Sequence, residues 1–323
     1  MKIIRQGNYT IGFKYYKNNL EITNNDDIER IKLLKIPPAY NNVTIINNKK
    51  IIAYGYDSKN RKQVLYNPDF IAKQNIKKYD KISASIKFFS KLKKKIAADL
   101  NSSNEKIKAI AIIITLIFTC GFRIGNKKYE KENNSVGLTT LKYKHLKFEG
   151  NRILIDFVGK KGVRNNAYCD NSKIFEYLDN KYKISAMEDY IFSYGTNKII
   201  TSNDVNEYLK EICNYYSKSN KFIITTKDLR TWNANMLFLN YYKKIRKDRE
   251  KNAKNAKNAK NAKNAKNAKN VKNADNDNER CVKKDIRTAI EMVAEKLHNT
   301  YNICKKSYID PKIIENICKL NEY

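Results

Sequence analysis

The hydrophobic positions of this chain follow two different patterns that meet near residue 80. Residues 1 to about 77 contain short apolar runs, such as 43–46 and 51–54, which are separated by Asn-Asn turns and a Pro37-Pro38 break. Such runs between turn residues are typical of β-strands. From about residue 82, apolar residues recur every three or four positions, which is the period of an amphipathic helix. We therefore predict a small β-rich domain over residues 1–77 and a larger domain over residues 78–323.

The second predicted domain combines helices with one small group of strands. Residues 107–119 are almost wholly apolar and are followed by Cys120-Gly121, which predicts a buried helix with a glycine C-cap. Short strands are predicted at 146–148, 153–157 and 163–169, so that Lys160 lies at the tip of a hairpin. Further helical stripes cover residues 205–216, 229–242 and 286–297, and Asp310-Pro311 begins a last helix.

A low-complexity tract interrupts this second domain at residues 251–272. It repeats Lys-Asn-Ala, with eight lysines and no acidic residue. A period of three drifts around a helix of 3.6 residues per turn, so the tract has no apolar face to bury. We expect a solvated, disordered insertion at a surface loop between two helices. A neutral repeat expansion in an A/T-rich genome explains it more simply than a specific function.

The charge of the chain points to a polyanionic partner. Lysine and arginine number 65 against 33 acidic residues, for a net charge of +32, which favours nucleic acid or an anionic membrane surface. A/T-rich codons account for part of this excess. Six cysteines without a C-x-x-C pair and only two histidines argue against zinc, so we expect reduced thiols and no metal site. No signal-like or 18-residue apolar stretch occurs, and we expect a soluble, intracellular protein without a membrane partner.

Five reactive side chains stand out in the second domain. They are Arg123 in CGFRIGNKKY, Lys160 in FVGKKG, Arg230 in KDLRTW, and His298 and Tyr308 in LHNTYNICKKSYIDP. Each alone has an ordinary explanation as a surface cation, a turn lysine, a helix cap or a packing tyrosine. Together they supply a phenol, a proton donor and several cationic or hydrogen-bonding groups, the set that a DNA strand transferase requires.

In their sequence and order, these motifs resemble those of the type IB DNA topoisomerases of poxviruses, giant DNA viruses and bacteria. The likeness extends to IPPAY at 36–40 and DSKNRKQVLY at 57–66, which are similar to the DNA-clamping sheet of that family. The resemblance implies an α+β fold with a small N-terminal antiparallel β-sheet domain. It also implies a larger, mainly α-helical catalytic domain that carries a small three-stranded sheet.

The resemblance also implies a role for each of the five residues. Tyr308 would attack the scissile phosphorus and form a 3′-phosphotyrosyl bond, while Arg123, Arg230 and His298 would hold the non-bridging oxygens. Lys160 would protonate the leaving 5′-oxygen as general acid. The adjacent Lys161 is the second candidate for that role.

The resemblance further implies an enzyme that relaxes supercoiled double-stranded DNA as a monomer, with no ATP and no obligatory metal ion. DNA contacts are implied at Gln63, Tyr66 and Tyr129. A viral source would place the protein in the virion and the host cytoplasm. The main alternative is a tyrosine site-specific recombinase or integrase, although recombinases generally have His-x-x-Arg where this chain has Lys227 to Arg230. A non-catalytic basic DNA-binding protein explains the charge but not the five ordered residues.

Overall fold

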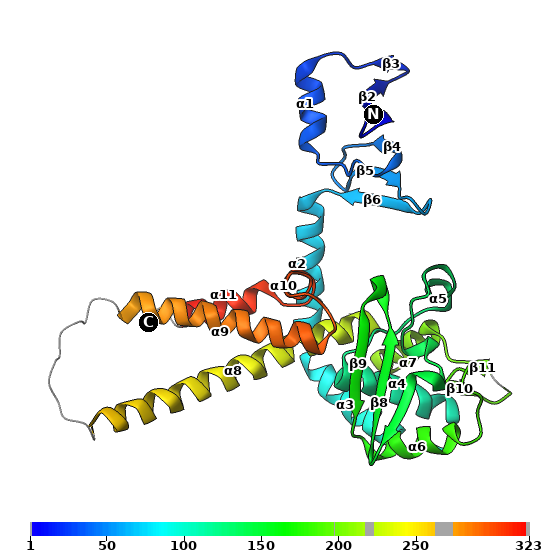
Figure 1. Cartoon of the computed structure of the whole chain (residues 1–323), viewed down its shortest axis with the longest axis vertical. Helices are drawn as coiled ribbons and strands as arrows, with labels where there is room; N and C mark the ends of the chain where they lie inside the picture. Colours follow the sequence, from blue (N-terminus) through cyan, green and yellow to red (C-terminus); the bar gives the residue numbers. More distant parts are fainter. Residues whose placement is uncertain (1, 197, 217–222, 262–273, 321–323) are drawn as a thin grey trace. The chain divides into compact units, whose positions relative to one another are not determined.

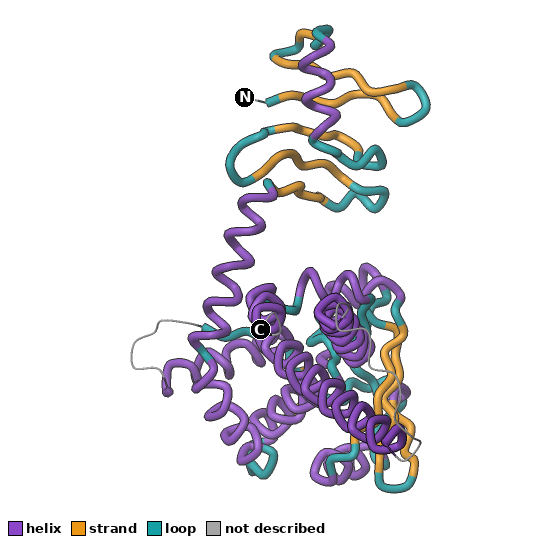
Figure 2. The backbone as a smooth tube through the Cα atoms, turned by 90° about the vertical axis from the view of Figure 1, so that its left-hand side faces the viewer, coloured by secondary structure: helices purple, strands orange, loops and turns teal. Residues whose placement is uncertain are grey.

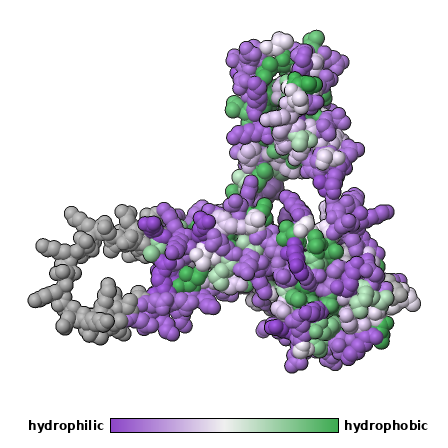
Figure 3. Space-filling model, viewed as in Figure 1, coloured by the Kyte–Doolittle hydropathy of each residue, from purple (hydrophilic) through white to green (hydrophobic). Residues whose placement is uncertain are grey.

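The computed structural model describes residues 2–196, 198–216, 223–261 and 274–320. The chain forms two compact units, Met1–Lys81 and Ile82–Tyr323 (Figure 1). The predicted division after residue 77 falls inside helix α2 (Pro68–Ala84), which begins in the first unit and ends in the second. Within the described ranges, no helix combines the length and apolar character that crossing a bilayer requires. On the face shown in Figure 3, hydrophilic residues cover most of the described surface.

The first unit is a six-stranded antiparallel sheet with one helix packed on it (Figure 2). The strand order is β3-β2-β1-β4-β5-β6. The strands are β1 (Ile3–Asn8), β2 (Gly12–Lys17), β3 (Leu20–Glu21), β4 (Asn41–Ile45), β5 (Ile51–Tyr56) and β6 (Lys62–Tyr66). Helix α1 (Asn25–Leu33), which the sequence pattern did not reveal, begins at Asn24, whose side chain accepts from the Asp27 amide. Ile31 of α1 and Val43 and Ile45 of β4 form the centre of the core.

Arg5 organises the IPPAY segment of this unit. The residue is buried on β1, and its guanidinium donates to the carbonyls of Pro37 at 3.0 Å and Tyr40 at 2.6 Å. Its other face lies 4.2 Å from the centroid of the Phe13 ring. The Pro37 carbonyl also accepts from the Tyr40 amide at 3.2 Å, so the buried guanidinium adds to a backbone turn in this segment. The two prolines are thereby fixed against the sheet.

The second unit is mainly helical. After α2, its helices are α3 (Ile86–Asp99), α4 (Glu105–Cys120), α5 (Lys127–Asn133), α6 (Ser172–Tyr182), α7 (Ser202–Tyr216), α8 (Thr226–Asn261), α9 (Ala274–Lys296), α10 (Tyr301–Ser307) and α11 (Pro311–Lys319). A three-stranded antiparallel sheet contains β7 (Leu146–Glu149), β8 (Arg152–Val158) and β9 (Arg164–Cys169), and a short hairpin contains β10 (Ser193–Tyr194) and β11 (Lys198–Ile199). The predicted α+β class is confirmed by this arrangement.

Helix α4 is the central element of the second unit. Nearly every residue from Ala109 to Ile117 is buried, because the helix contacts α3, α7, α8 and strand β9. Asn104 caps its first turn, and Gly121 ends it in the left-handed conformation with φ of 68°. The apolar run and the glycine cap therefore predicted this helix correctly.

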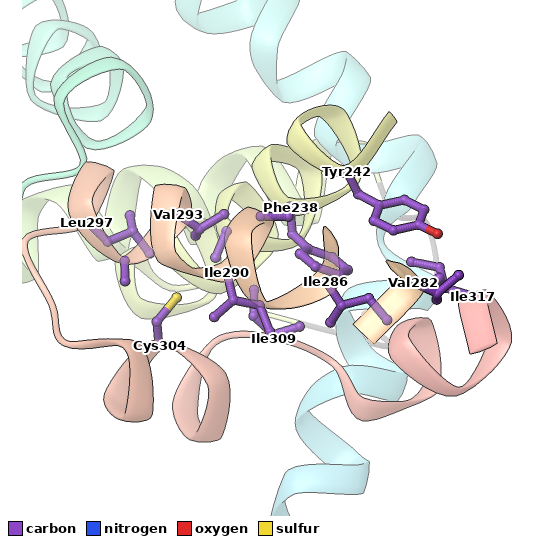
Figure 4. Packing of buried hydrophobic residues seen from close by; sticks show 13 residues of the cluster. Phe238, Tyr242, Val282, Ile286, Ile290, Val293, Leu297, Cys304, Ile309 and Ile317 are labelled. Carbon is purple, nitrogen blue, oxygen red and sulfur yellow. The ribbon is translucent and has the colours of Figure 1, made fainter. Parts of the chain in front are cut away.

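A second hydrophobic core joins α8 and α9 to the carboxyl-terminal segments. Phe238 and Tyr242 of α8 face Ile286, Ile290 and Val293 of α9, and the side chains interleave between the two helices (Figure 4). Residues from the last part of the chain complete the cluster, namely Cys304, Ile309 and Ile317. This packing fixes the segment around Tyr308 to the helix that carries Arg230.

The lysine tract differs from its prediction over its first half. Residues 251–261 continue helix α8, whereas we expected an unstructured insertion; residues 262–272 lie outside the described part of the chain. Alanine and lysine are both good helix formers. A helix that is already nucleated and packed extends one residue at a time at little cost, even without an apolar face.

Candidate active site around Tyr308

The backbone of Tyr308 is held by the helix that carries Arg230. Tyr308 ends α10, and its amide donates to the Cys304 carbonyl at 2.9 Å. The buried side chain of Asn235 donates through Nδ2 to the Tyr308 carbonyl and accepts through Oδ1 from the Asp310 amide, both at 2.8 Å. The side-chain amide of Asn235 therefore fixes the backbone at Tyr308 and at Asp310. The sequence analysis did not identify Asn235. The signal available for it was a polar residue beside the inward-facing positions of the predicted 229–242 helix.

Arg230 lies in the first turn of α8 and is only 4 % exposed. Its Nη1 donates to the Gly121 carbonyl, and its Nη2 donates to the Leu297 carbonyl at 3.2 Å. The guanidinium carbon lies 5.4 Å from the centroid of the Tyr308 ring. Burial lowers the pKa of Arg230, and the nearby Tyr308 raises it by a smaller amount. The side chain thus joins the ends of α4 and α9 beside the phenol.

A close contact between two glycines shapes the loop that carries Arg123. The Arg123 carbonyl accepts from the Leu138 amide at 2.9 Å. A Cβ atom on Gly137 would lie 2.4 Å from the Gly125 Cα, a distance that only glycine tolerates. At the end of the side chain, Arg123 Nη2 donates to Asn299 Oδ1. The loop therefore presents Arg123 to the end of α9.

His298 occupies the left-handed position that follows α9, with φ of 51°. Its amide donates to the Glu295 carbonyl and the Asn299 amide donates to the Ala294 carbonyl, both at 2.9 Å, the paired bonds of a Schellman cap. The His298 Nε2 lies 3.0 Å from the Cys120 carbonyl, and the ring stacks on Phe122 with centroids 5.3 Å apart. Because a carbonyl only accepts, Nε2 carries the proton. Burial lowers the pKa of His298, and the nearby arginines lower it further against the Cys120 hydrogen bond.

Lys160 lies where the sequence placed it, in the turn between β8 and β9. This side chain is exposed, and the turn closes through the Gly159 amide and the Val163 carbonyl at 2.8 Å. Lys161 next to it has a φ of 63°, and Gly162 has a φ of 73°. The turn therefore combines one left-handed lysine with a glycine at its tip.

The charges around Tyr308 favour its ionised form. Burial alone raises the pKa of the phenol, but the charges of Arg230 and Arg123, a hydrogen bond from Arg230 and the charge of Lys160 outweigh it. The net effect is a pKa below the ordinary tyrosine value. A phenol that ionises more readily among cations has the surroundings that suit a nucleophile acting on an anion.

The three residues implied to contact DNA have different surroundings. Gln63 of β6 is half-buried, and its Nε2 donates to Asp57 Oδ2 at 2.9 Å. Tyr66 ends β6, is 39 % exposed and stacks on Phe70. Tyr129 lies on α5 and is 60 % exposed. Gln63 and Tyr66 belong to the first unit, and Tyr129 belongs to the second. Their contacts with DNA stay predictions.

Sequence comparisons identify the family to which this fold and this group of residues belong. Residues 59–309 match the family described as "Eukaryotic DNA topoisomerase I, catalytic core". Residues 12–57 match "Bacterial DNA topoisomerase IB, N-terminal domain". The chain belongs to the type IB DNA topoisomerases, as its motifs predicted.

Viral proteins are among the relatives that this chain matches. It is 31 % identical over 315 residues to the DNA topoisomerase 1B of Acanthamoeba polyphaga mimivirus, covering 92 % of this chain and 81 % of that protein. It is 27 % identical over 325 residues to the DNA topoisomerase 1B of vaccinia virus (strain Western Reserve), covering 96 % and 88 %. Among solved structures, the XerH site-specific recombinase in a post-cleavage complex aligns at 14 % identity with a TM-score of 0.42, over 71 % of this chain and 50 % of that one.

Proposed function

We propose that this type IB DNA topoisomerase uses Tyr308 as its nucleophile and requires neither ATP nor a metal ion. It relaxes supercoiled duplex DNA by cutting one strand, letting the duplex swivel and resealing the cut. The observation that carries the residue assignment is the phenol of Tyr308, whose ring centroid lies 5.4 Å from the Arg230 guanidinium carbon and whose pKa is lowered by the charges of Arg230, Arg123 and Lys160. An electrophile that suits this position is an anion, because the charges that act on the phenol are positive.

The proposed reaction exchanges one phosphodiester bond for another. The phenolate oxygen of Tyr308, which has already lost its proton to solvent, forms a bond to the scissile phosphorus as the bond to the 5′-oxygen breaks, leaving a 3′-phosphotyrosyl link and, once protonated, a free 5′-hydroxyl. Lys160 gives its proton to the departing oxygen and recovers it on religation. The exposed hairpin position suits such a donor, and a general acid contributes about 10²–10⁴ in rate. Because one ester replaces another, the energy of the bond is retained and ATP is not consumed.

The phosphate itself is proposed to be held by Arg123, Arg230 and a third donor from the end of α9. Charge on the non-bridging oxygens increases in the transition state, and N–H donors fixed in a protein interior stabilise that charge strongly. Arg230 is well suited to this role because two backbone carbonyls fix its orientation. The sequence predicted His298 as the third donor.

The wider proposal is a monomer that acts on double-stranded DNA inside the cell, with no membrane partner. The net charge of +32 supports binding to a polyanion. The match to viral proteins supports a viral source, which would place the protein in the virion and the host cytoplasm.

Relaxation of a supercoiled plasmid in a chelator, without ATP, tests this function. We expect relaxed topoisomers from the wild-type chain and none from Tyr308→Phe, which should still bind duplex DNA because only the attacking oxygen is removed. A tyrosine recombinase would instead need paired target sites and partner protomers. Strand exchange between such sites without plasmid relaxation would favour the recombinase.

A further inference from the structure

We propose that Asn165 positions Lys160, because its side chain holds the turn between β8 and β9 in the form that presents the lysine to the leaving oxygen. The inference rests on the proposed function, in which Lys160 is the general acid, and it adds a residue that acts through Lys160. Asn165 is a buried amide on an apolar face, its partner is the carbonyl that closes the turn, and a glycine leaves room for it.

Asn165 is a polar residue on the buried face of the three-stranded sheet. It is 2 % exposed and lies directly opposite Phe157 in the register of β8 and β9. The Phe157 ring packs edge-on against Phe122, with centroids 4.9 Å apart. Side chains alternate between the two faces of a strand, and the neighbours Arg164 and Asn166 are exposed. A buried amide costs free energy unless it is hydrogen-bonded, so the partner of Asn165 shows what the amide stabilises.

That partner is the carbonyl that closes the turn. Asn165 Nδ2 donates to the Val163 carbonyl at 2.7 Å, and the Gly159 amide donates to the same oxygen at 2.8 Å. A carbonyl oxygen has two lone pairs, and both have a donor here. The Gly162 amide donates in turn to the Gly159 carbonyl at 3.1 Å. Asn165 therefore fixes the acceptor on which the hydrogen bonds around Lys160 depend.

Gly159 leaves the space that the Asn165 amide occupies. A Cβ atom on Gly159 would lie 2.5 Å from Asn165 Nδ2 and 3.2 Å from its Cγ. The backbone of Gly159 is extended, with φ of −100°, so the position needs glycine for space and not for an unusual conformation. The glycine and the buried amide thus form one fitted contact at the start of the turn that carries Lys160.

The base of this hairpin is fixed from outside the turn. The Val158 carbonyl accepts from the Val136 amide at 3.0 Å, and two residues later the Leu138 amide donates to the Arg123 carbonyl at 2.9 Å. The segment 136–138 therefore joins the Lys160 hairpin to the loop that carries Arg123. Lys160 itself is exposed, and a lysine side chain carries about 2 kcal/mol of rotamer entropy. Such a flexible donor reaches its acceptor often only if the turn beneath it keeps one conformation.

Single-turnover cleavage of two duplexes tests the role of Asn165. One duplex has an ordinary scissile phosphodiester, and the other has a 5′-bridging sulfur, whose thiolate leaves without a proton from Lys160. Asn165→Ala should slow cleavage of the first about tenfold or more, a part of the about 10²–10⁴ that a general acid contributes. It should cleave the second at close to the wild-type rate, whereas a defect in the whole site would slow both. Asn166→Ala is the matched control, because it removes an amide from the exposed face of the same strand, and it should leave both rates unchanged.

A double variant gives a second readout. Asn165→Ala combined with Lys160→Ala should cleave the phosphodiester no more slowly than Lys160→Ala alone, because a positioning residue has no effect once the residue that it positions is gone. Gly159→Ala disturbs the same contact from the other side and should give the same selective loss. It keeps the test decisive if Asn165→Ala does not fold, which thermal unfolding of each variant shows.

Three results would overturn the inference. They are an unchanged rate on the phosphodiester in Asn165→Ala, equal slowing of both duplexes by the folded variants, and a double variant in which the two losses multiply. The proposed function fails separately. A wild-type chain that forms no adduct at Tyr308 would refute that function, and a Lys160→Ala variant that the bridging sulfur does not rescue would refute Lys160 as the general acid.

Discussion

Tyr308 is a half-buried phenol whose surroundings favour its charged form. Its pKa is lowered because the charges of Arg230, Arg123 and Lys160 outweigh the effect of burial. A lowered pKa means that the phenolate is present at lower pH than for free tyrosine, whose pKa is about 10. The rate of strand cleavage should therefore rise with pH and level off below that value.

Removing one of these charges should shift the pH profile in a known direction. Arg123→Ala removes a positive charge, so the pKa of Tyr308 rises and the ascending limb of cleavage rate against pH moves to higher pH. Arg123→Lys keeps the charge but loses the paired N–H donors of the planar guanidinium. It should therefore lower the maximal cleavage rate without shifting the pH at which the rate rises. An unchanged limb in Arg123→Ala would contradict the assignment of Tyr308 as the titrating nucleophile.

The general acid is tested by a leaving group that needs no proton. A substrate with a 5′-bridging sulfur at the scissile link expels a thiolate, so it should restore cleavage by Lys160→Ala but not by Arg123→Ala. Lys161→Ala is the matched control, because it removes the same charge from the same turn. Rescue of Lys161→Ala in place of Lys160→Ala would move the role to that residue.

The sequence indicated which residues are candidates for the chemistry but not which side chains hold them in place. Arg123, Arg230 and Tyr308 stand in recognisable motifs, and the structure brings them together around one phenol. Asn235 and Asn299 were missed, since their importance comes from hydrogen bonds to residues 73 and 176 positions away. The position of Asn235 on the predicted 229–242 helix indicated a polar residue near the core, but only the folded chain shows which backbone groups it holds.

At the scale of elements, the loop after α4 depends on the contact between Gly125 and Gly137. Gly137→Ala places a methyl group against backbone atoms, which cannot rotate away as a flexible side chain can. We expect a loss of about 1–3 kcal/mol in the free energy of unfolding, the usual cost of overpacking. Cleavage should also slow, because the loop carries Arg123.

Gly150→Ala is the control for this substitution. Gly150 lies in the β7–β8 turn with φ of 58° and open space around it. Its replacement by alanine should lower the free energy of unfolding by about 1–2 kcal/mol, because only the left-handed backbone is unfavourable for a side chain there. Urea unfolding and single-turnover cleavage should separate the two variants, with slow cleavage confined to Gly137→Ala. Equal cleavage by both would show that the glycine contact does not position Arg123.

Elements with a clear boundary signal could be predicted from the sequence, including the nine-residue α11 after Asp310, whereas the 17-residue α2 was missed because its first half falls in the predicted β-rich domain. Helix α4 was predicted because its apolar run and Gly121 indicate the same boundary. Helices α1 and α10 were missed because nine and seven residues give too few turns for a clear period. The helical residues 251–261 were missed for another reason, since amphipathic patterning does not detect a helix that extends from a packed one.

At the scale of the whole molecule, the lysine tract should add affinity for DNA without reading its sequence. The helical residues 251–261 extend α8 by about 16 Å at 1.5 Å per residue. The lysines in this part of the tract are therefore spread along the axis of α8. Each phosphate contact contributes about −0.9 to the slope of log affinity against log salt. Replacing the eight lysines of residues 251–272 with glutamine should flatten that slope by about one unit or more.

The same replacement should leave cleavage unchanged once DNA is bound, because no catalytic group lies in the tract. Glutamine keeps the length and a similar helix propensity, so the comparison isolates charge. Identical salt slopes for the two proteins would show that the tract is a passive expansion. A slower single-turnover rate at saturating protein would show that it supports the site.

The covalent intermediate tests the central claim most directly. The chain should be trapped on a random-sequence duplex that is labelled on one strand, then digested and sequenced around the linked residue. We predict that the DNA is joined through its 3′-phosphate to Tyr308, that the released strand ends in a 5′-hydroxyl, and that Tyr308→Phe forms no adduct. A 5′-phosphate link, an adduct on another residue or an adduct in Tyr308→Phe would contradict the account.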